Sequence, residues 1–468
     1  MRPRTLVEKV WDDHVILDLG DGEQLLHVDR HWLNDNAYNA IDGLDRRALS
    51  VRNPELTFAV IDHLLDTRPG RTYATGSASA QEWAEGTREG CARHGITFID
   101  IGDRRHGISH VISAELGATL PGTLLVCTDS HTCTNGAFGA YACGVGAFGG
   151  TQVLATQTMI ARRPQTMRVR FTGSPGPGAT PKDVVLALIG RFGATAALGH
   201  AVEFCGPVID RMTIEERMTI CNMGVEFGAA TAMIAPDQTT FDYLEGRDYA
   251  PTGPSWDQAV AYWRTLPTDQ DATFDRELTL DCADMEPQIT WGTSPEQVVP
   301  IGGAVPDPSS FEDPGRRRAA ERALQYMGLA PGDPLHGLPI QAAFIGSCTN
   351  ARLDDLRAAA AVLRGRRVAP GVHATCVPGS ASTKRAAEAE GLDRIFIEAG
   401  FTWGEAGCSL CMTAVVDGPA PGARIVSSTN RSSEGRQGPG VRAHLASPVT
   451  VAASAVAGQI VGARELTA

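Results

Sequence analysis

The chain has 468 residues, 43% of them hydrophobic, and a formal net charge of −13. This length predicts about three domains, and the acidic balance disfavours non-specific binding to nucleic acid or to an anionic membrane. Eleven cysteines follow a charged start without a secretory signal, so we expect a reducing, cytoplasmic setting with few disulfides. The longest uncharged run near the end, residues 445–463, predicts a buried helix entered after Pro448 rather than a membrane span.

The first region, residues 1–164, opens with two short predicted strands at 15–19 and 25–29, which form either a hairpin or two separate short strands. Asp62 and His63 then follow an apolar run. A carboxylate beside an imidazole at a strand end is a useful pair for proton transfer. A surface turn explains the same two residues, so the pair alone does not decide the function.

A denser polar group follows the next predicted strand, residues 123–127. Asp129, Ser130 and His131 lie within three positions, and His110 precedes them. A Ser-His-Asp hydrolase is the weaker interpretation, because no G-x-S-x-G turn surrounds Ser130 and adjacent residues do not easily form a linear relay. We therefore expect these residues to belong to a site of another kind.

Residues 144–149 match the pattern G-x-G-x-x-G. We reject a dinucleotide site, because residues 135–143 do not form a clean apolar strand and no acidic residue follows until Asp183. The small residues are instead expected to let the backbone pack closely near the site.

The second region, residues 165–286, contains a predicted strand at 167–171 and a helix entered through Thr180. Residues 214–227 predict another helix, on which Asn222 and Glu226 would share a face. A solvated surface pair fits poorly with the apolar character of this segment, so both are candidate site residues.

The third region, residues 287–468, alternates predicted strands and helices. This rhythm predicts a parallel sheet with helices outside, whose ligands bind at the carboxyl ends of the strands. The predicted strands are 342–346, 372–377, 395–398 and 424–426, and the predicted helices are 352–363 and 384–390.

Three cysteines stand out in this region. Cys348 follows a predicted strand, and Cys408 and Cys411 form a C-x-x-C pair further on. A four-iron cluster usually takes four cysteines, whereas zinc needs a fourth Cys or His, and the nearest downstream candidate is His444. From spacing alone, a cluster with three protein ligands, a zinc site and three unrelated buried thiols all remain open.

An iron without a protein ligand would give the other residues a chemical purpose. Such an iron acts as a Lewis acid that makes hydroxide a possible leaving group, while histidines and aspartates manage protons. Arg431 and Arg436 lie in a Ser/Gly-rich loop after a predicted strand, and arginines bind carboxylates by paired hydrogen bonds. Exposed surface arginines are the alternative interpretation.

These motifs, in their order along the chain, resemble the aconitase superfamily and, within it, the branch of isopropylmalate dehydratase large subunits. The resemblance runs from Thr5 to about Gly462. The motifs that carry it are Thr128-Asp129-Ser130-His131-Thr132, Gly346-Ser347-Cys348-Thr349-Asn350, Gly407-Cys408-Ser409-Leu410-Cys411, and Asn430-Arg431 with Gly435-Arg436.

The resemblance implies an α/β fold of three α/β/α domains, residues 1–164, 165–286 and 287–468, around a cleft that contains the cluster. It implies one [4Fe-4S] cluster per subunit, held by Cys348, Cys408 and Cys411. The implied catalytic residues are Asp62, His63, His110, Asp129, His131 and Glu226, and the implied substrate-binding residues are Ser130, Asn222, Arg431 and Arg436.

The resemblance also implies a partner. The family's fourth (swivel) domain has no room in this chain, and in the isopropylmalate branch it is a separate small subunit, which predicts a heterodimer or heterotetramer. The implied activity is that of a hydro-lyase in leucine biosynthesis, which converts 2-isopropylmalate to 3-isopropylmalate or acts on a related alkylmalate. The implied ligand is a small di- or tricarboxylate, and neither a membrane nor a nucleic-acid partner is expected.

Several positions depart from that branch, which leaves the substrate open. They are Asn135, residues 147–152, Ser432-Ser433 and Leu64-Leu65-Asp66. Because the metal ligands and proton-handling residues remain, we hypothesise dehydratase chemistry on a shifted substrate, and a homoaconitase- or methylmalate-type enzyme is the alternative. An RNA-binding regulatory protein of the same fold is a different class, disfavoured by the acidic charge and the lack of a basic patch interleaved with aromatic residues.

Overall fold

The computed structural model describes residues 2–35, 37–75, 77–412 and 418–466. The chain forms two compact units. The first contains residues 1–64, 72–173 and 197–281, and the second contains residues 65–71, 174–196 and 282–468. Parallel sheets with helices around them confirm the predicted α/β class, while the division into three domains stays a prediction.

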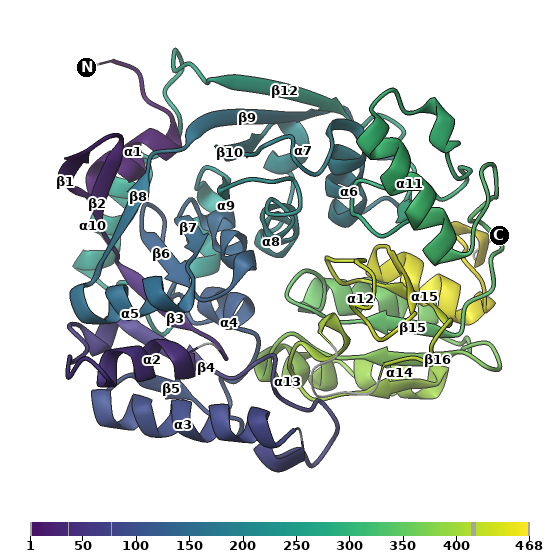
Figure 1. Cartoon of the computed structure of the whole chain (residues 1–468), viewed down its shortest axis with the longest axis horizontal. Helices are drawn as coiled ribbons and strands as arrows, with labels where there is room; N and C mark the ends of the chain where they lie inside the picture. The colour runs from purple at the N-terminus through teal and green to yellow at the C-terminus, as the bar shows by residue number, and fades with distance from the viewer. Residues whose placement is uncertain (1, 36, 76, 413–417, 467–468) are drawn as a thin grey trace. The chain divides into compact units, whose positions relative to one another are not determined.

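A five-stranded parallel sheet of order β5-β4-β3-β6-β7 lies in the first unit. Helices α2, α3 and α5 pack on one face, where Ile41 and Cys91 belong to the core (Figure 1). Helix α4 packs on the other face, where Ile112 joins Trp32 and Phe58. Burial on both faces explains the apolar strands. These elements are β3 Arg30–Leu33, β4 Thr57–Val60, β5 Thr97–Ile99, β6 Leu124–Cys127, β7 Tyr141–Gly144, α2 Ala37–Asp45, α3 Ala78–His94, α4 Ser109–Glu115 and α5 Ala147–Thr156.

Two further sheets belong to the first unit. One is antiparallel, of order β1-β2-β8, and its first two strands form the hairpin, the first of the two predicted arrangements. The other is parallel, of order β11-β10-β9-β12. The bounds are β1 Val15–Gly20, β2 Glu23–His27, β8 Thr158–Arg162, β9 Gln165–Thr172, β10 His200–Cys205, β11 Thr231–Met233, β12 Arg276–Asp281, α1 Leu6–His14, α7 Pro207–Asp210, α8 Ile214–Asn222, α9 Gln238–Leu244 and α10 Pro254–Trp263.

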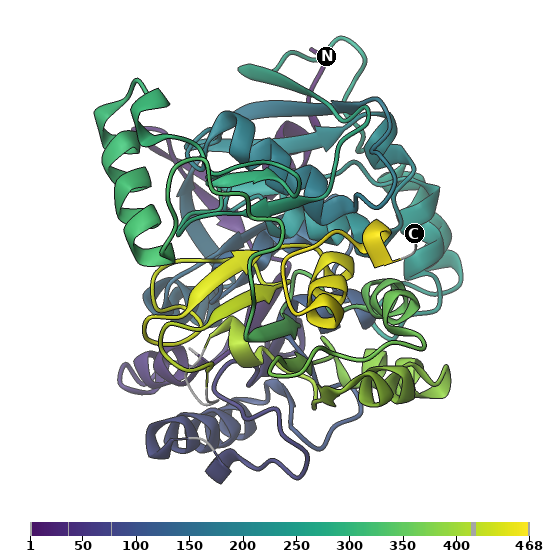
Figure 2. The same cartoon turned by 90° about the vertical axis from the view of Figure 1, so that its right-hand side faces the viewer.

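The second unit contains a parallel five-stranded sheet of order β17-β16-β15-β18-β19. Its last two strands run side by side in yellow in Figure 2. Helix α6 begins after Thr180 as predicted, with a capping box to Asp183. The bounds are α6 Pro181–Phe192, β13 Gln288–Thr290, β14 Val298–Pro300, α11 Pro314–Met327, β15 Ala342–Ile345, α12 Leu353–Leu363, β16 His373–Cys376, α13 Ala381–Ala389, α14 Leu392–Ala399, β17 Phe401–Trp403, β18 Arg424–Ser427, β19 Arg442–Leu445 and α15 Pro448–Ala457.

The strand predicted at residues 395–398 is wrong, because these residues lie in helix α14. Leu392, Phe396 and Ala399 are buried at helical spacing, so the period of the apolar side chains is that of a helix. The strand of this βαβ unit comes later, as β17.

The helix predicted over residues 214–227 is too long, because α8 ends at Asn222. A side chain at Gly224 would place its Cβ 2.5 Å from Cβ of Ala232, and Gly228 has a φ of +92°. This close approach and the following turn stop the helix. Asn222 and Glu226 therefore do not share a helical face.

The uncharged run at residues 445–463 contains the buried helix α15, as predicted. Among the residues that the structure describes, no helix combines the length and the apolar character that crossing a bilayer requires.

Candidate functional site

The polar residues of the first unit gather at one edge of its five-stranded sheet. Strand β3 lies between β4 and β6, and all three run parallel. Their carboxyl ends therefore meet at the same edge. Asp35 follows β3, Asp62 and His63 follow β4, and Asp129 follows β6.

Two carboxylates hold the imidazole of His63. Its Nδ1 lies 2.7 Å from Oδ1 of Asp62 and 3.2 Å from Oδ2 of Asp35. Asp35 also accepts the backbone N–H groups of His63 and Leu64, and Asp62 accepts that of Ser109 at the start of α4. These bonds fix the orientation of the ring and leave Nε2 as the atom that can exchange a proton.

Asp129 connects three histidines. Its Oδ1 lies 2.9 Å from Nε2 of His110 and accepts the backbone N–H of His131 at 2.7 Å. Its Oδ2 lies 3.5 Å from Nε2 of His63. A partly buried carboxylate in contact with several imidazoles can share charge and protons among them.

A second carboxylate extends this network. Nε2 of His131 lies 2.9 Å from Oε1 of Glu226, and both side chains are buried. Asn222 is also buried and donates to Oγ1 of Thr134 at 2.8 Å. Ser130 is exposed, with its hydroxyl 3.4 Å from Nδ1 of His131. The structure thus brings together all the predicted site residues of the first unit.

The carboxylates of this network differ in their proton affinity. Burial opposes ionisation of Asp129, but hydrogen bonds from His110 and His131 outweigh it and hold the pKa of Asp129 well below its usual range. Burial raises the pKa of Asp62, and the nearby charge of Asp35 raises it further, despite the opposing effect of His63. Asp62 is therefore the better proton holder and Asp129 the better permanent anion.

The sequence analysis missed Asp35, which follows the short strand β3. An available signal was the polar pair Asn34 and Asp35 directly after the apolar Trp32 and Leu33, the same pattern that identified Asp62. Asn34 also belongs to the network, since its Nδ2 lies 3.3 Å from Oδ2 of Asp129.

The glycine motif at residues 144–149 packs closely beside these residues, as expected. A Cβ at Gly144 would lie 2.5 Å from the backbone oxygen of Asp129, so only glycine fits there. One of the two reasons for rejecting a dinucleotide site was wrong, because a strand, β7 (Tyr141–Gly144), does lead into the motif, whereas the lack of an acidic residue before Asp183 remains.

The three predicted cysteine ligands lie in the second unit. Cys348 lies in the turn after β15, and Cys408 and Cys411 bracket a helical turn after β17. All three are buried. One side chain joins the two loops, because Oγ of Ser347 lies 3.9 Å from Sγ of Cys348 and 3.6 Å from Sγ of Cys411.

Hydrogen-bond donors point at these sulfurs. Nδ2 of Asn430 lies 3.6 Å from Sγ of Cys348, and Nη2 of Arg436 lies 3.9 Å from Sγ of Cys411. Such donors stabilise sulfur that carries negative charge, as it does in an iron–sulfur cluster. Three gathered, buried thiols with these donors fit an iron–sulfur cluster.

His444, the downstream histidine considered for zinc, is engaged elsewhere. Its Nδ1 lies 2.6 Å from the carbonyl oxygen of Thr290, and its Nε2 lies 2.7 Å from Nη1 of Arg424. Burial and the charge of Arg424 lower the pKa of His444 to about 3. This arrangement supplies no zinc ligand, and it favours the cluster.

Two buried cations hold the cysteine loops. Lys182 is fully buried, and its ammonium donates to the carbonyl oxygens of Ser428 and Thr429 at 2.9 and 2.6 Å. Arg352 donates to the carbonyl oxygens of Cys348 and Thr349 at 2.7 and 2.6 Å. The turn that carries Cys348 and the turn before Asn430 are thereby fixed by charge-assisted bonds.

The two predicted substrate arginines lie in one loop of this unit. Arg431 is partly exposed and follows Asn430, and the guanidinium of Arg436 reaches Cys411. The structure thus divides the predicted residues into two groups, with the carboxylates, histidines, Ser130 and Asn222 in the first unit and the cysteines and arginines in the second.

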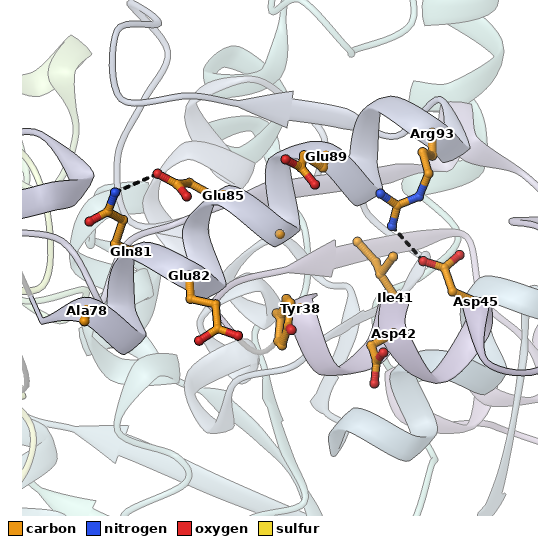
Figure 3. Close-up of a pocket in the computed structure, with 11 residues that line it drawn as sticks. Tyr38, Ile41, Asp42, Asp45, Ala78, Gln81, Glu82, Glu85, Glu89 and Arg93 are labelled. Atoms are coloured by element: carbon orange, nitrogen blue, oxygen red, sulfur yellow. Dashed lines mark hydrogen bonds and ion pairs between the residues drawn. The ribbon is translucent and has the colours of Figure 1, made fainter.

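A cavity of about 470 Å³ lies elsewhere in the first unit, between α2 and α3 (Figure 3). Asp42 lines it from α2, and Glu82 and Glu89 line it from α3. It contains none of the predicted site residues, and the sequence analysis singled out none of its lining residues.

The profile of the aconitase family (aconitate hydratase) matches residues 8–458. The 3-isopropylmalate dehydratase large subunit 1 of Bradyrhizobium diazoefficiens is 55% identical over 468 residues, which cover 99% of this chain and 97% of that protein. A crystal structure of aconitase X from Thermococcus kodakaraensis, in its holo-form, superposes with a TM-score of 0.46 at 12% identity, over 87% of this chain and 84% of that one.

Proposed function

Because this chain belongs to the aconitase family, we propose that it is the large, cluster-binding subunit of an isopropylmalate dehydratase. The reaction removes the hydroxyl group of 2-isopropylmalate with a neighbouring proton and adds water back in the opposite sense, which gives 3-isopropylmalate. The observation that carries this proposal is the 55% identity, over nearly the full length of both chains, to a 3-isopropylmalate dehydratase large subunit.

The proposed cofactor is one [4Fe-4S] cluster per subunit, held by Cys348, Cys408 and Cys411. The buried sulfurs and the donors directed at them support this ligand set. With three protein ligands, the cluster supplies one iron as a Lewis acid toward the hydroxyl and carboxylate groups of the substrate.

Proton transfer is assigned to the network of the first unit. His63, oriented by Asp62 and Asp35, gives the proton to the departing hydroxyl. His110, Asp129 and His131 hold the water that leaves and returns, and Glu226 balances the charge of His131. The raised pKa of Asp62 supports its role as a proton source for His63.

Substrate carboxylates are assigned to Arg431 and Arg436, with Ser130 and Asn222 as polar contacts. A guanidinium beside a cysteine sulfur, as at Arg436, suits an acid that binds next to the cluster. The substrate is therefore a small di- or tricarboxylate.

The family resemblance assigns the base that removes the carbon-bound proton to a separate small subunit, together with further arginines. We propose that the working enzyme is a heterodimer or heterotetramer with that subunit. A reducing compartment such as the cytoplasm suits the eleven cysteines. The acidic charge supports neither a membrane nor a nucleic-acid partner.

One position that departs from the family branch has a structural role in this chain. Asn135 is buried, and its Oδ1 accepts the hydroxyls of Ser113 and Thr119 at 2.6 Å each. Asn135 therefore has a structural role as a buried hydrogen-bond acceptor, and its departure from the family pattern is no argument for a changed substrate. Competition between 2-isopropylmalate and other malates tests which alkyl group the substrate carries.

The test is co-purification with a candidate small subunit, reconstitution without oxygen, and chromatographic separation of 2- and 3-isopropylmalate. We expect interconversion by the wild-type complex and none by the complex that carries Cys408→Ser. Citrate, homocitrate, methylmalates and dialkylmalates serve as competing substrates. If the complex holds a cluster, converts a different malate and leaves 2-isopropylmalate unchanged, that other malate replaces 2-isopropylmalate as the proposed substrate.

A further inference from the structure

Ser347 has a backbone conformation that its residue type does not favour. Its φ is +90°, in the left-handed region that costs a residue other than glycine about 1 kcal/mol or more. Glycine would adopt it freely. The neighbouring Gly346 is needed for a different reason, because a Cβ there would lie 2.2 Å from the ring of Phe344. The presence of a serine rather than a glycine at position 347 therefore needs a separate explanation.

The hydroxyl of Ser347 lies between two proposed cluster ligands that come from different loops. Its Oγ is 3.6 Å from Sγ of Cys411 and 3.9 Å from Sγ of Cys348. The backbone N–H of Thr349 donates to the same Oγ at 3.4 Å. Because that N–H occupies a lone pair of the oxygen, the hydroxyl proton is free to point at sulfur. The side chain is fully buried, so water does not compete for this proton.

We propose that Ser347 is a positioning residue of the cluster, which donates a hydrogen bond to the sulfurs of Cys411 and Cys348 and thereby stabilises the reduced cluster. This inference rests on the proposed cluster. A donor to a ligand sulfur stabilises the more negative, reduced form, so it raises the reduction potential. The strained backbone is the cost of holding the hydroxyl between the two loops.

Ser409 provides a matched control within the same site. It is also left-handed, with a φ of +49°, and lies between Cys408 and Cys411. The hydroxyl of Thr67 donates to Oγ of Ser409 at 2.9 Å. Ser409→Gly removes a similar strain without removing a bond between Ser347 and sulfur.

The experiment compares S347G, S347A and S409G with the wild-type chain, each reconstituted without oxygen. The measurements are iron and sulfide content, the thermal midpoint of the cluster-free chain, the reduction potential, and the Fe–S stretching frequencies in H₂O and D₂O. We expect S347G to raise the thermal midpoint, because it relieves strain, and S409G to raise it less, because that variant also loses the buried hydrogen bond from Thr67. We expect only S347G and S347A to lower the potential, by an amount that reflects about a tenfold change in the reduction equilibrium, or about 59 mV for one electron.

S347G and S347A should also lose part of the deuterium shift of the Fe–S frequencies. A purely structural role of Ser347 would leave that shift unchanged. An unchanged potential in S347G and S347A, with a wild-type chain that holds its cluster, overturns the role of Ser347 and leaves the proposed function intact. An equal fall of the potential in S409G overturns it too. A wild-type chain that takes up no iron and sulfide overturns the proposed function, and this inference with it.

Discussion

The carboxylate of Asp35 holds His63 at two atoms. Its Oδ2 accepts the backbone N–H of His63 at 3.0 Å and lies 3.2 Å from the ring Nδ1 of the same residue. The main chain and the imidazole are thus fixed by one buried side chain. A proton donor gains efficiency from such fixed geometry.

Asp35→Asn should therefore lower turnover without unfolding the protein. Asparagine has one acceptor oxygen, so it can keep only one of the two backbone bonds that Asp35 accepts from His63 and Leu64, and it no longer carries the charge that orients the imidazole. We expect kcat of the complex to fall by about 10- to 100-fold with a smaller change in KM. Steady-state kinetics check this, with Asp21→Asn in an exposed turn as the control. A rise in KM with an unchanged kcat would mean that Asp35 acts on binding rather than on proton transfer.

Glu226→Gln tests the contact between Glu226 and His131. Nε2 of His131 and Oε1 of Glu226 lie 2.9 Å apart in a buried environment, so the change removes one of the two carboxylates beside the imidazole and leaves only Asp129, 3.6 Å from its Nδ1. We expect about a tenfold or larger loss of kcat with unchanged iron content. The exposed Glu245, changed to Gln, is the control. Loss of iron from the Glu226 variant would contradict this role.

The pair of His14 and Asp29 predicts how stability depends on pH. Burial opposes the charge of His14, but the hydrogen bond and charge of Asp29 outweigh it and raise the pKa of His14 above its ordinary value of 6.5. Burial likewise opposes ionisation of Asp29, but the hydrogen bond and the charge of His14 outweigh the effect of burial. The pKa of Asp29 therefore falls below its ordinary value of 3.8.

A raised histidine pKa stabilises the fold fully below the unfolded value, and this stabilisation is lost as the pH rises through the folded value. A lowered aspartate pKa stabilises above the unfolded value, and this contribution is lost as the pH falls through the folded value. His14→Gln should therefore reduce the thermal midpoint by a few degrees between pH 3.8 and 6.5, and by less at higher pH. Thermal unfolding of the cluster-free chain measures this, and a deficit that grows above pH 7 would refute it. The exposed His373, changed to Gln, is the control.

Lys182→Met should weaken the second unit and its hold on the cluster. The change removes the ammonium from the carbonyl oxygens of Ser428 and Thr429, which are then buried without that partner. We expect a loss of about 3 kcal/mol in the free energy of unfolding and faster loss of iron to a chelator. Denaturant titration and chelator kinetics measure the two effects. Lys384→Met, which breaks a pair with Glu388, should cost less than about 1 kcal/mol.

Serine substitutions test the cysteine ligands. Cys348→Ser, Cys408→Ser and Cys411→Ser should each reduce the iron content after reconstitution from about four per chain toward zero. Cys205→Ser, at a partly buried cysteine of β10 in the other unit, should keep it. Iron and sulfide analysis with EPR gives the answer. Equal iron in all four variants would mean that these thiols are not the ligands.

The sequence by itself determined the α/β class, the pair of strands β1 and β2, the strands that precede Asp129, Cys348 and Arg431, and the aconitase resemblance. Apolar runs that end in polar residues are local patterns, and the chemistry of Asp129 or Cys348 depends on residue type and on its place at a strand end. These features are written in consecutive residues, so they could be predicted without coordinates.

Only the tertiary structure decided the rest. The end of α8 depends on Gly224 meeting Ala232. The role of Asp35 depends on β3 lying between β4 and β6. The φ of Ser347 and its distances to Cys348 and Cys411 depend on where two separate loops fold. Each of these involves contacts between residues distant in the chain, which local patterns do not encode.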